Sequence, residues 1–256
     1  MPLVVRFSAP TSSQPGYGVV DEGKVAVIEP HPFTPHRRTG DTLPLEKVRL
    51  LAPVIPSKVV CVGRNYREHA RELGGEVPDE PLIFLKPSTA VIGPYDAIRY
   101  PTQLTSDVHY EGELAVVIGR LVYQVAPEQA AAAIYGFTCG NDITARDLQR
   151  KDGQWTRAKG FDTFCPLGPA ISTALDPYRA RLRTYVDGEL RQDGSTAGMV
   201  FDVATIVSHV SQVMTLLPGD VILTGTPAGV GPVEVGQTIR VEIEGIGVLE
   251  NPVSMR

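Results

Sequence analysis

The sequence has few cysteines and no excess of basic residues. It contains 256 residues, in which Cys61, Cys139 and Cys165 stand far apart with no C-x-x-C pair. An odd number of widely spaced cysteines argues against a disulfide framework and against a zinc site, so we expect reduced, buried thiols. The 24 Lys and Arg residues against 29 Asp and Glu residues give a net charge of −5, without any basic run. This balance argues against nucleic acid as a partner.

Long apolar runs are also missing. Runs such as residues 114–118 fall far short of the roughly 18 consecutive apolar residues that a membrane span requires. The first ten residues, MPLVVRFSAP, contain neither a basic leader nor an A-x-A cleavage signal. We therefore expect a cytoplasmic protein that does not bind membranes. Hydrophobic residues at 43% and charged residues at 21% are typical of a globular protein, which argues against disorder.

The first fifty residues differ in composition from the rest. Short runs of strand-forming residues occur at 3–7, 18–20 and 25–28. Residues 30–42, rich in Pro, His, Arg and Thr, are typical of a loop, and residues 43–57, with three prolines, are typical of a linker. We predict a small β-rich N-terminal segment with a linker over residues 1–55 and a main domain over residues 56–256.

The main domain contains compact β-rich runs bounded by Gly, Pro or polar residues. These runs are VVCVG (59–63), PLIFL (81–85), ELAVVIG (113–119), ILTG (222–225) and TIRVEI (238–243). Helical patterns are fewer, at residues 65–73, 127–133 and 203–217. Long alternating β–α units are missing, which argues against a doubly wound sheet. We predict an α+β fold with a rolled or sandwiched mixed sheet.

Two glutamates stand two residues apart at the head of an apolar strand. In HYEGEL (109–114), the period-2 geometry of a strand projects Glu111 and Glu113 from the same face. Two neighbouring carboxylates repel each other and resist burial, and a cation would remove that conflict. On this motif alone, a solvated strand end remains the alternative.

A third carboxylate, Asp142, changes that balance. It follows an apolar stretch in GNDITARDLQ, where Gly140 and Asn141 can turn the chain and present it at a strand edge. Three carboxylates without a His or Cys partner form a hard oxygen site, suited to Mg²⁺, Mn²⁺ or Ca²⁺ rather than zinc. Three protein ligands leave about three octahedral positions for water or a chelating substrate, as catalysis requires.

Six motifs in this order resemble the fumarylacetoacetate hydrolase family, and most closely its short single-lobe members. They are GRNYREHARE (63–72), FLKPST (84–89), HYEGEL (109–114), GNDITARDLQ (140–149), WTRAKGFDTFCPLGP (155–169) and GDVILTGTPAGVGP (219–232). The resemblance covers roughly residues 58–252. It implies a mixed β-sandwich roll, a homodimer, and Mg²⁺ or Mn²⁺ held by Glu111, Glu113 and Asp142.

The segment GRNYREHARE also predicts a short helix. Asn65 is suited to cap it with Glu68 in a capping box, and Gly74 and Gly75 end it. Such a short helix needs docking for stability, so it can act as a lid. His69 and Glu72, three residues apart, lie on one flank of this helix. The resemblance implies that His69, oriented by Glu72, activates water; an exposed surface histidine is the alternative.

Further site residues follow from the resemblance. Lys159 matches an active-site lysine whose ammonium would stabilise developing negative charge, although a solvated surface lysine is the alternative. Arg64 and Gln149 match positions of the substrate pocket. Gly225 allows a tight turn whose backbone N–H groups could receive a substrate carboxylate, and the position of Thr226 touches the ligand in the family.

We therefore expect a divalent-metal-dependent hydrolase that cleaves a C–C bond of a small 2-oxo acid of the acylpyruvate type. Oxaloacetate decarboxylation, or isomerisation of 2-hydroxyhepta-2,4-diene-1,7-dioate, in the same site is the alternative, because pocket walls decide between them. A non-catalytic metal-dependent binding protein is a remote alternative. The stretch VVCVGRNY (59–66) lacks the additional acidic ligand of full-length fumarylacetoacetases, so we do not expect that activity itself.

Overall fold

The computed structural model describes residues 2–10, 12–72 and 74–256. The N-terminal strands are β1 (Leu3–Ser8), β2 (Gly16–Asp21), β3 (Lys24–Glu29), β4 (Arg37–Pro44) and β5 (Arg49–Leu51). The next strands are β6 (Val59–Gly63), β7 (Leu82–Lys86), β8 (Val91–Ile92), β9 (Ile98–Tyr100), β10 (Val108–Tyr110), β11 (Gly112–Ile118), β12 (Ile134–Asn141) and β13 (Thr144–Ala145). The last are β14 (Cys165–Ser172), β15 (Arg181–Val186), β16 (Glu189–Ser195), β17 (Val221–Leu223), β18 (Gly231–Pro232), β19 (Thr238–Ile243) and β20 (Gly247–Met255).

Helices are short and few. The α-helices are α1 (Arg67–Glu72), α2 (Pro127–Ala130), α3 (Arg146–Asp152), α4 (Thr156–Lys159) and α5 (Val203–Val213). Single 3₁₀ turns are η1 (Leu45–Lys47), η2 (Ser88–Ala90), η3 (Ala131–Ala133) and η4 (Thr196–Gly198).

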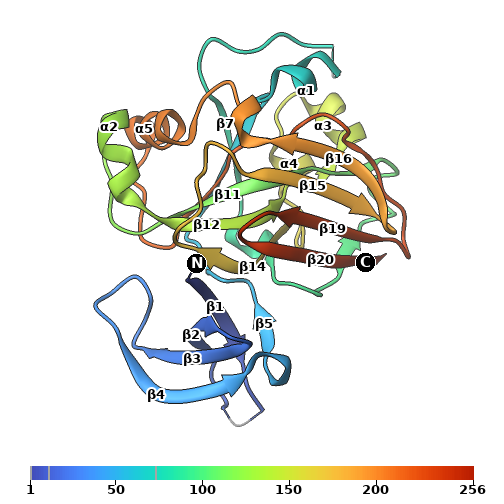
Figure 1. Cartoon of the computed structure of the whole chain (residues 1–256). Helices are drawn as coiled ribbons and strands as arrows, with labels where there is room; N and C mark the ends of the chain where they lie inside the picture. The colour runs from blue at the N-terminus through green and yellow to red at the C-terminus, as the bar shows by residue number, and fades with distance from the viewer. Residues whose placement is uncertain (1, 11, 73) are drawn as a thin grey trace.

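The described strands form mixed sheets, which confirms the α+β prediction (Figure 1). The largest sheet has the order β4-β3-β2-β1-β14-β12-β11-β17-β6-β7, with β5 added to β1 and β8 to β14. A second sheet has the order β16-β15-β19-β20-β9, and a third has the order β13-β10-β18. Most neighbours are antiparallel, whereas the pairs β6–β17, β8–β14 and β9–β20 run parallel. The N-terminal strands lie below the rest in Figure 1 and join the large sheet where β1 pairs with β14.

The predicted N-terminal strands are confirmed, but the predicted loop and linker are partly wrong. Residues 37–44 form β4, which pairs antiparallel with β3, and residues 45–51 contain η1 and β5. Strand β4 was missed because it lies at the edge of the sheet and most of its side chains are exposed. A strand that buries neither face carries no alternating apolar pattern, so its sequence is similar to that of a loop.

The site lies at the start of β11, a fully buried strand. All seven residues of β11 are buried. Because successive side chains point to opposite faces, Leu114 and Val116 pack with Ile206 of α5 in one core cluster. Ala115 and Val117 pack in a second cluster on the other face, among residues of β14 and β17. Packing on both faces fixes the register of the strand that carries Glu113.

Two helix predictions need correction at their ends. Helix α5 begins at the predicted residue, where the Asp202 carboxylate accepts a hydrogen bond from the Thr205 N–H at 2.8 Å. It ends at Val213 rather than at residue 217, because the Leu216 backbone instead exchanges hydrogen bonds with Val122. Residues 127–133 are helical as predicted, although the second half is the 3₁₀ turn η3. Helices α3 and α4 were not predicted.

Helix α1, for which a role as a lid was predicted and which is called the lid below, begins two residues later than predicted, and Leu73 lies outside the described residues. Asn65 does not cap it. The Asn65 side-chain amide donates to the carbonyl oxygens of Thr224 and Phe201 at 2.8 and 3.0 Å, and its oxygen accepts from the Phe201 N–H at 2.8 Å. The role of Asn65 is therefore long-range: it fastens the start of the lid segment to the end of β17.

Candidate active site

One cavity of about 460 Å³ brings the predicted residues together. Every predicted site residue except Gly225 lines it. The lining consists of Val62, Gly63, Arg64, His69, Glu72, Phe84, His109, Glu111, Glu113, Asp142, Arg146, Gln149, Arg150, Trp155, Lys159 and Thr226. These residues come from β6, α1, β7, β10, β11, α3, α4 and the loop after β17, so the cavity depends on the whole fold.

The three predicted carboxylates cluster in this cavity. One oxygen from each of Glu111, Glu113 and Asp142 lies within 4.8 Å of the other two, and all three residues are at most 5% exposed. The backbone holds them together: the Asp142 N–H donates to the Glu111 carbonyl at 2.8 Å, and the Glu111 N–H donates to the Asn141 side chain at 2.9 Å. The alternative of a solvated strand end is therefore wrong.

The clustering of the carboxylates affects the protonation of Glu113. Burial, together with the nearby charges of Asp142 and Glu111, raises the pKa of Glu113 well above its ordinary value. The Gly225 N–H donates to Glu113 at 2.6 Å, and Gly225 adopts a φ of +98°, which side chains other than glycine rarely tolerate. This N–H was expected to receive a substrate carboxylate, and that expectation is wrong because Glu113 takes it.

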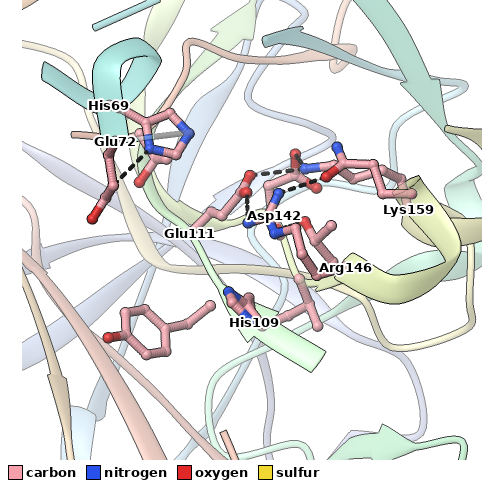
Figure 2. A network of polar contacts seen from close by, with 12 residues as sticks. His69, Glu72, His109, Glu111, Asp142, Arg146 and Lys159 are labelled. Atoms are coloured by element: carbon pink, nitrogen blue, oxygen red, sulfur yellow. Dashed lines mark hydrogen bonds and ion pairs between the residues drawn. The ribbon is translucent and has the colours of Figure 1, made fainter. Parts of the chain in front are cut away.

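Three buried cations contact the other two carboxylates, and Figure 2 shows two of them, Lys159 and Arg146. The Lys159 ammonium donates to Glu111 at 2.8 Å and to Asp142 at 2.6 Å, and the Arg146 guanidinium donates to Glu111. The Lys86 ammonium donates to the second Asp142 oxygen at 2.6 Å. Lys159 is 2% exposed, so the alternative of a solvated surface lysine is wrong.

These contacts shift the protonation equilibria within the cluster. Burial alone would raise the pKa of Glu111, but Lys159 and Arg146 lower it well below its ordinary value. Burial alone would lower the pKa of Lys159, but Asp142 and Glu111 raise it. Sequence reasoning missed Lys86 and Arg146, although both lie inside the motifs FLKPST and GNDITARDLQ.

The carboxylate cluster fits a hard divalent cation. Its oxygen donors converge from Glu111, Glu113 and Asp142, and their spacing allows one ion to contact all three. Within the described residues Glu113 forms no ion pair, and its carboxylate accepts a hydrogen bond from the Gly225 N–H. Carboxylate oxygens select Mg²⁺, Mn²⁺ or Ca²⁺ over softer metals.

His69 and Glu72 form a pair on the lid. The His69 Nδ1 atom lies 3.2 Å from a Glu72 oxygen, and His69 is only 4% exposed, so the alternative of an exposed surface histidine is wrong. Glu72 also accepts from the Gly229 N–H at 3.1 Å. Glu72 thereby links the lid to the loop after β17, and Figure 2 shows the pair at one side of Glu111.

Two predicted substrate residues have protein partners that orient them. The Thr226 hydroxyl donates to the Gly112 carbonyl at 2.7 Å and accepts from the Gln192 side chain at 2.7 Å. The Gln149 carbonyl oxygen accepts from Arg146 at 2.7 Å, which leaves its amide N–H groups for another partner. Gln192 was not predicted, since it lies in a strand far from all six family motifs.

The remaining lining residues include an aromatic pair and a group of polar and charged side chains. Phe84 and Trp155 pack edge to face with ring centroids 5.1 Å apart. Opposite charges meet where His109 and Arg150 each contact an Asp107 oxygen at 2.7 Å. Burial and the nearby Arg146 charge lower the pKa of His109. The three cysteines are free and buried, and burial raises the pKa of each thiol above its ordinary value, as is typical of structural thiols.

The described helices include none that is both long enough and apolar enough to cross a membrane.

Comparison with known proteins extends over nearly the whole chain. The family model described as fumarylacetoacetate (FAA) hydrolase C-terminal matches residues 58–254, and the model described as Rv2993c-like, N-terminal matches residues 3–53. Protein Rv2993c of Mycobacterium tuberculosis is 57% identical over 88% of this chain and 86% of its own length. The mitochondrial oxaloacetate tautomerase FAHD2B of Bos taurus is 41% identical over 98% of this chain and 91% of its own length.

Solved structures of similar sequence have the same fold as this chain. The 2-hydroxyhepta-2,4-diene-1,7-dioate isomerase from Mycobacterium marinum is 49% identical, with a TM-score of 0.92 over 100% of this chain and 99% of that one. The fumarylpyruvate hydrolase from Pseudomonas aeruginosa, in complex with Mn²⁺ and pyruvate, is 38% identical, with a TM-score of 0.74 over 81% of this chain and 92% of that one.

Proposed function

Because the chain belongs to the fumarylacetoacetate hydrolase family, we propose that it is a Mg²⁺- or Mn²⁺-dependent hydrolase that cleaves a C–C bond of a small acylpyruvate-type acid. One observation carries the proposal. The convergent carboxylates of Glu111, Glu113 and Asp142 share a cavity with the buried His69 and its partner Glu72. A cation site beside a histidine–carboxylate pair supplies both a Lewis acid and a base that can activate water.

Glu111, Glu113 and Asp142 would hold the metal ion. A bound divalent ion would polarise the 2-oxo group and supply positive charge for the negative charge that develops there. The cations Lys159 and Arg146 are fixed against two of these carboxylates, so their charges add to the positive field without reorganisation.

His69 supplies the base. Its Nδ1 edge faces Glu72, which holds the ring and stabilises the imidazolium that forms when the other ring nitrogen takes a proton from water. Hydroxide then adds to the distal carbonyl, the bond between C3 and C4 breaks, and the electron pair remains on C3 as the enolate of pyruvate. His69 returns its proton to C3, so that the products are pyruvate and a carboxylic acid.

Keto–enol tautomerisation of oxaloacetate is a second candidate. The similarity to the oxaloacetate tautomerase FAHD2B of Bos taurus supports this candidate, because that protein is 41% identical over 98% of this chain. In that reaction His69 would move a proton at C3 and no water would be consumed. Decarboxylation of oxaloacetate belongs to the same group of reactions, and so does isomerisation of a hydroxydienoate, the activity for which the Mycobacterium marinum protein is named.

Product analysis separates these reactions. The protein is incubated with acylpyruvates, oxaloacetate and a 2-hydroxydienoate, each with Mg²⁺, with Mn²⁺ and with chelator. We expect pyruvate and a carboxylic acid from the acylpyruvate only when metal is present. Proton exchange at C3 of oxaloacetate without cleavage of an acylpyruvate would favour assignment as a tautomerase over assignment as a hydrolase. If no substrate is turned over in a metal-dependent way, both assignments are contradicted.

A further inference from the structure

A buried amide that lies outside the six motifs contacts two parts of the site. Gln192 is 0% exposed, whereas most residues of β16 are exposed. Its carbonyl oxygen accepts from the Gly112 N–H at 3.0 Å. Its amide nitrogen donates to the Thr226 hydroxyl at 2.7 Å and to the Pro227 carbonyl at 2.8 Å. Gln192 therefore connects a strand of the second sheet to β11 and to the loop after β17.

The partners of this amide fix its orientation. A backbone N–H can only donate and a carbonyl can only accept, so the Gln192 oxygen must face Gly112 and its nitrogen must face Pro227. The Thr226 hydroxyl accepts from that nitrogen and donates its own proton to the Gly112 carbonyl at 2.7 Å. Gly112, Gln192 and Thr226 thus close a ring of three hydrogen bonds in which every donor has an acceptor.

The ring holds a glycine between two of the predicted metal ligands, Glu111 and Glu113. Glycine has more conformational freedom than any other residue, so a strand is least constrained where it contains one. Glycine is required here, because a Cβ atom on Gly112 would lie 2.1 Å from the Thr184 hydroxyl oxygen and 3.3 Å from the Gln192 oxygen. The same close approach lets the ring bind both backbone groups of Gly112, which restrains the residue.

A β-bulge lies next to Gln192. Thr184 of β15 lies opposite Gln192, but the next residue, Tyr185, lies opposite Leu190, so Arg191 is an extra residue in β16. Bulges of this kind interrupt regular pairing and redirect a side chain, often beside an active site. The bulge adjoins the one residue of this strand pair that contacts both Gly112 and Thr226, as expected for a bulge that directs this side chain.

We propose that Gln192 is a positioning residue for the divalent metal ion. Through Gly112 it fixes the stretch of backbone from which the carboxylates of Glu111 and Glu113 extend. The proposal rests on the proposed function, which assigns these carboxylates to the metal. Gln192 acts through the backbone and not as a ligand, because its oxygen and its nitrogen are both used by the protein. Replacing a residue that orients metal ligands commonly weakens metal binding by about 10- to 100-fold.

Equilibrium binding of Mn²⁺ to protein freed of metal tests the proposal without turnover. Gln192→Met keeps the length of the side chain and removes its hydrogen bonds. The Kd for Mn²⁺, measured from the electron paramagnetic resonance signal of the free ion, should therefore rise by about tenfold or more.

The matched control is Asn251→Leu. Asn251 is a 1% exposed amide of β20, in the same sheet as Gln192, and it donates to the carbonyls of Gly93 and Asp96 at 2.9 Å. Its loss should lower the melting temperature while the Kd for Mn²⁺ changes by less than about twofold, since these contacts are separate from the ring. Each variant is titrated well below its melting temperature.

Thr226→Val opens the same ring from the loop after β17. It should also raise the Kd for Mn²⁺, so the proposal stays testable if Gln192→Met does not fold. The double variant should bind Mn²⁺ about as weakly as the weaker of the two single variants, because each change opens the same ring.

Three results would overturn the role of Gln192 and leave the proposed function standing. They are a Kd for Gln192→Met within about twofold of the wild type, an equal rise in Asn251→Leu, and effects that multiply in the double variant. Failure of the wild type to bind Mn²⁺ would overturn the proposed function as well.

Discussion

Lys86 and Asp142 form an ion pair that is closed to solvent. The Lys86 ammonium lies 2.6 Å from an Asp142 oxygen, and the two side chains are 0% and 1% exposed. Lys86 also donates to the Ile143 carbonyl at 3.0 Å. The pair connects the edge strand β7 to a residue at the centre of the site, so it contributes both to folding and to the position of the carboxylate.

Removing one partner of this pair should destabilise the protein strongly. Lys86→Met leaves the Asp142 carboxylate buried with one of its cations missing, and breaking such a pair costs on the order of 3–5 kcal/mol. Urea unfolding measures the change in the free energy of unfolding. Arg181→Met is the matched control: its pair with Asp193 is exposed, so the cost should stay below about 1 kcal/mol. An equal decrease in the free energy of unfolding for the two variants would contradict the conclusion that burial makes the Lys86–Asp142 pair more important.

Glu113→Gln should abolish metal-dependent activity without unfolding the protein. Glutamine keeps an oxygen that can accept from the Gly225 N–H, but it removes one charged ligand. In chelator the variant should be as stable as the wild type or more stable, because it replaces a carboxylate that is repelled by its neighbours. Added Mn²⁺ should raise the melting temperature of the wild type and not that of the variant. Full turnover by Glu113→Gln would contradict the ligand assignment.

The same residue predicts a pH dependence of stability in chelator. The pKa of Glu113 is higher in the folded protein than its ordinary value of 4.5, since burial and the charges of Asp142 and Glu111 disfavour its ionised form. Its contribution is therefore complete below that ordinary value and is lost as the pH rises through the raised pKa. The wild-type melting temperature should fall over this range more steeply than that of Glu113→Gln. If the melting temperatures of the wild type and of Glu113→Gln change with pH in parallel, the raised pKa of Glu113 is contradicted.

The position of Asp142 illustrates how far the sequence predicts the site. The E-x-E spacing in a strand places Glu111 and Glu113 together by local geometry alone, and the family motifs add Asp142. Lys86 reaches the same carboxylate from β7, which lies at the far edge of the large sheet from the N-terminal strands. Its presence there depends on the order of the strands, which no local pattern in the sequence specifies.

Asn65 and Gly225 were predicted wrongly for a related reason. Asn65 was expected to bind a backbone N–H of the adjacent helix, and the N–H groups of the turn at Gly225 were expected to bind a substrate carboxylate. In the fold, both find distant partners: Asn65 binds Thr224 and Phe201, and Gly225 binds Glu113. Tertiary contacts replaced the local ones because the lid and the turn meet at the end of β17.

His69 should matter more for hydrolysis than for decarboxylation. Hydrolysis needs activated water, whereas carbon dioxide departs without attack by a nucleophile. His69→Ala should therefore lower kcat/KM for an acylpyruvate on the order of a hundredfold or more. Oxaloacetate decarboxylation should fall much less. Glu68→Gln, on the exposed side of the same helix, is the matched control and should leave both rates unchanged. Equal losses on both substrates would mean that His69 only helps to close the lid.

The protein is expected to be a homodimer, a proposal that rests on the family. The chain mass is 27.6 kDa, so light scattering at micromolar concentration should report twice that mass. In a groove that Met214 also lines, the apolar side chains of Leu82 and Leu85 are exposed, as on surfaces that associate. A mass equal to that of one chain would contradict the proposal.

The central claim is that Glu111, Glu113 and Asp142 hold a divalent ion on which cleavage of a 2-oxo acid depends. Its most direct test is the initial rate of pyruvate formation from an acylpyruvate, measured on enzyme treated with chelator and then titrated with Mn²⁺. The rate should be close to zero after chelation and should saturate when about one ion is bound per chain. Full activity in the chelated enzyme, or a rate that does not respond to Mn²⁺, would contradict the claim.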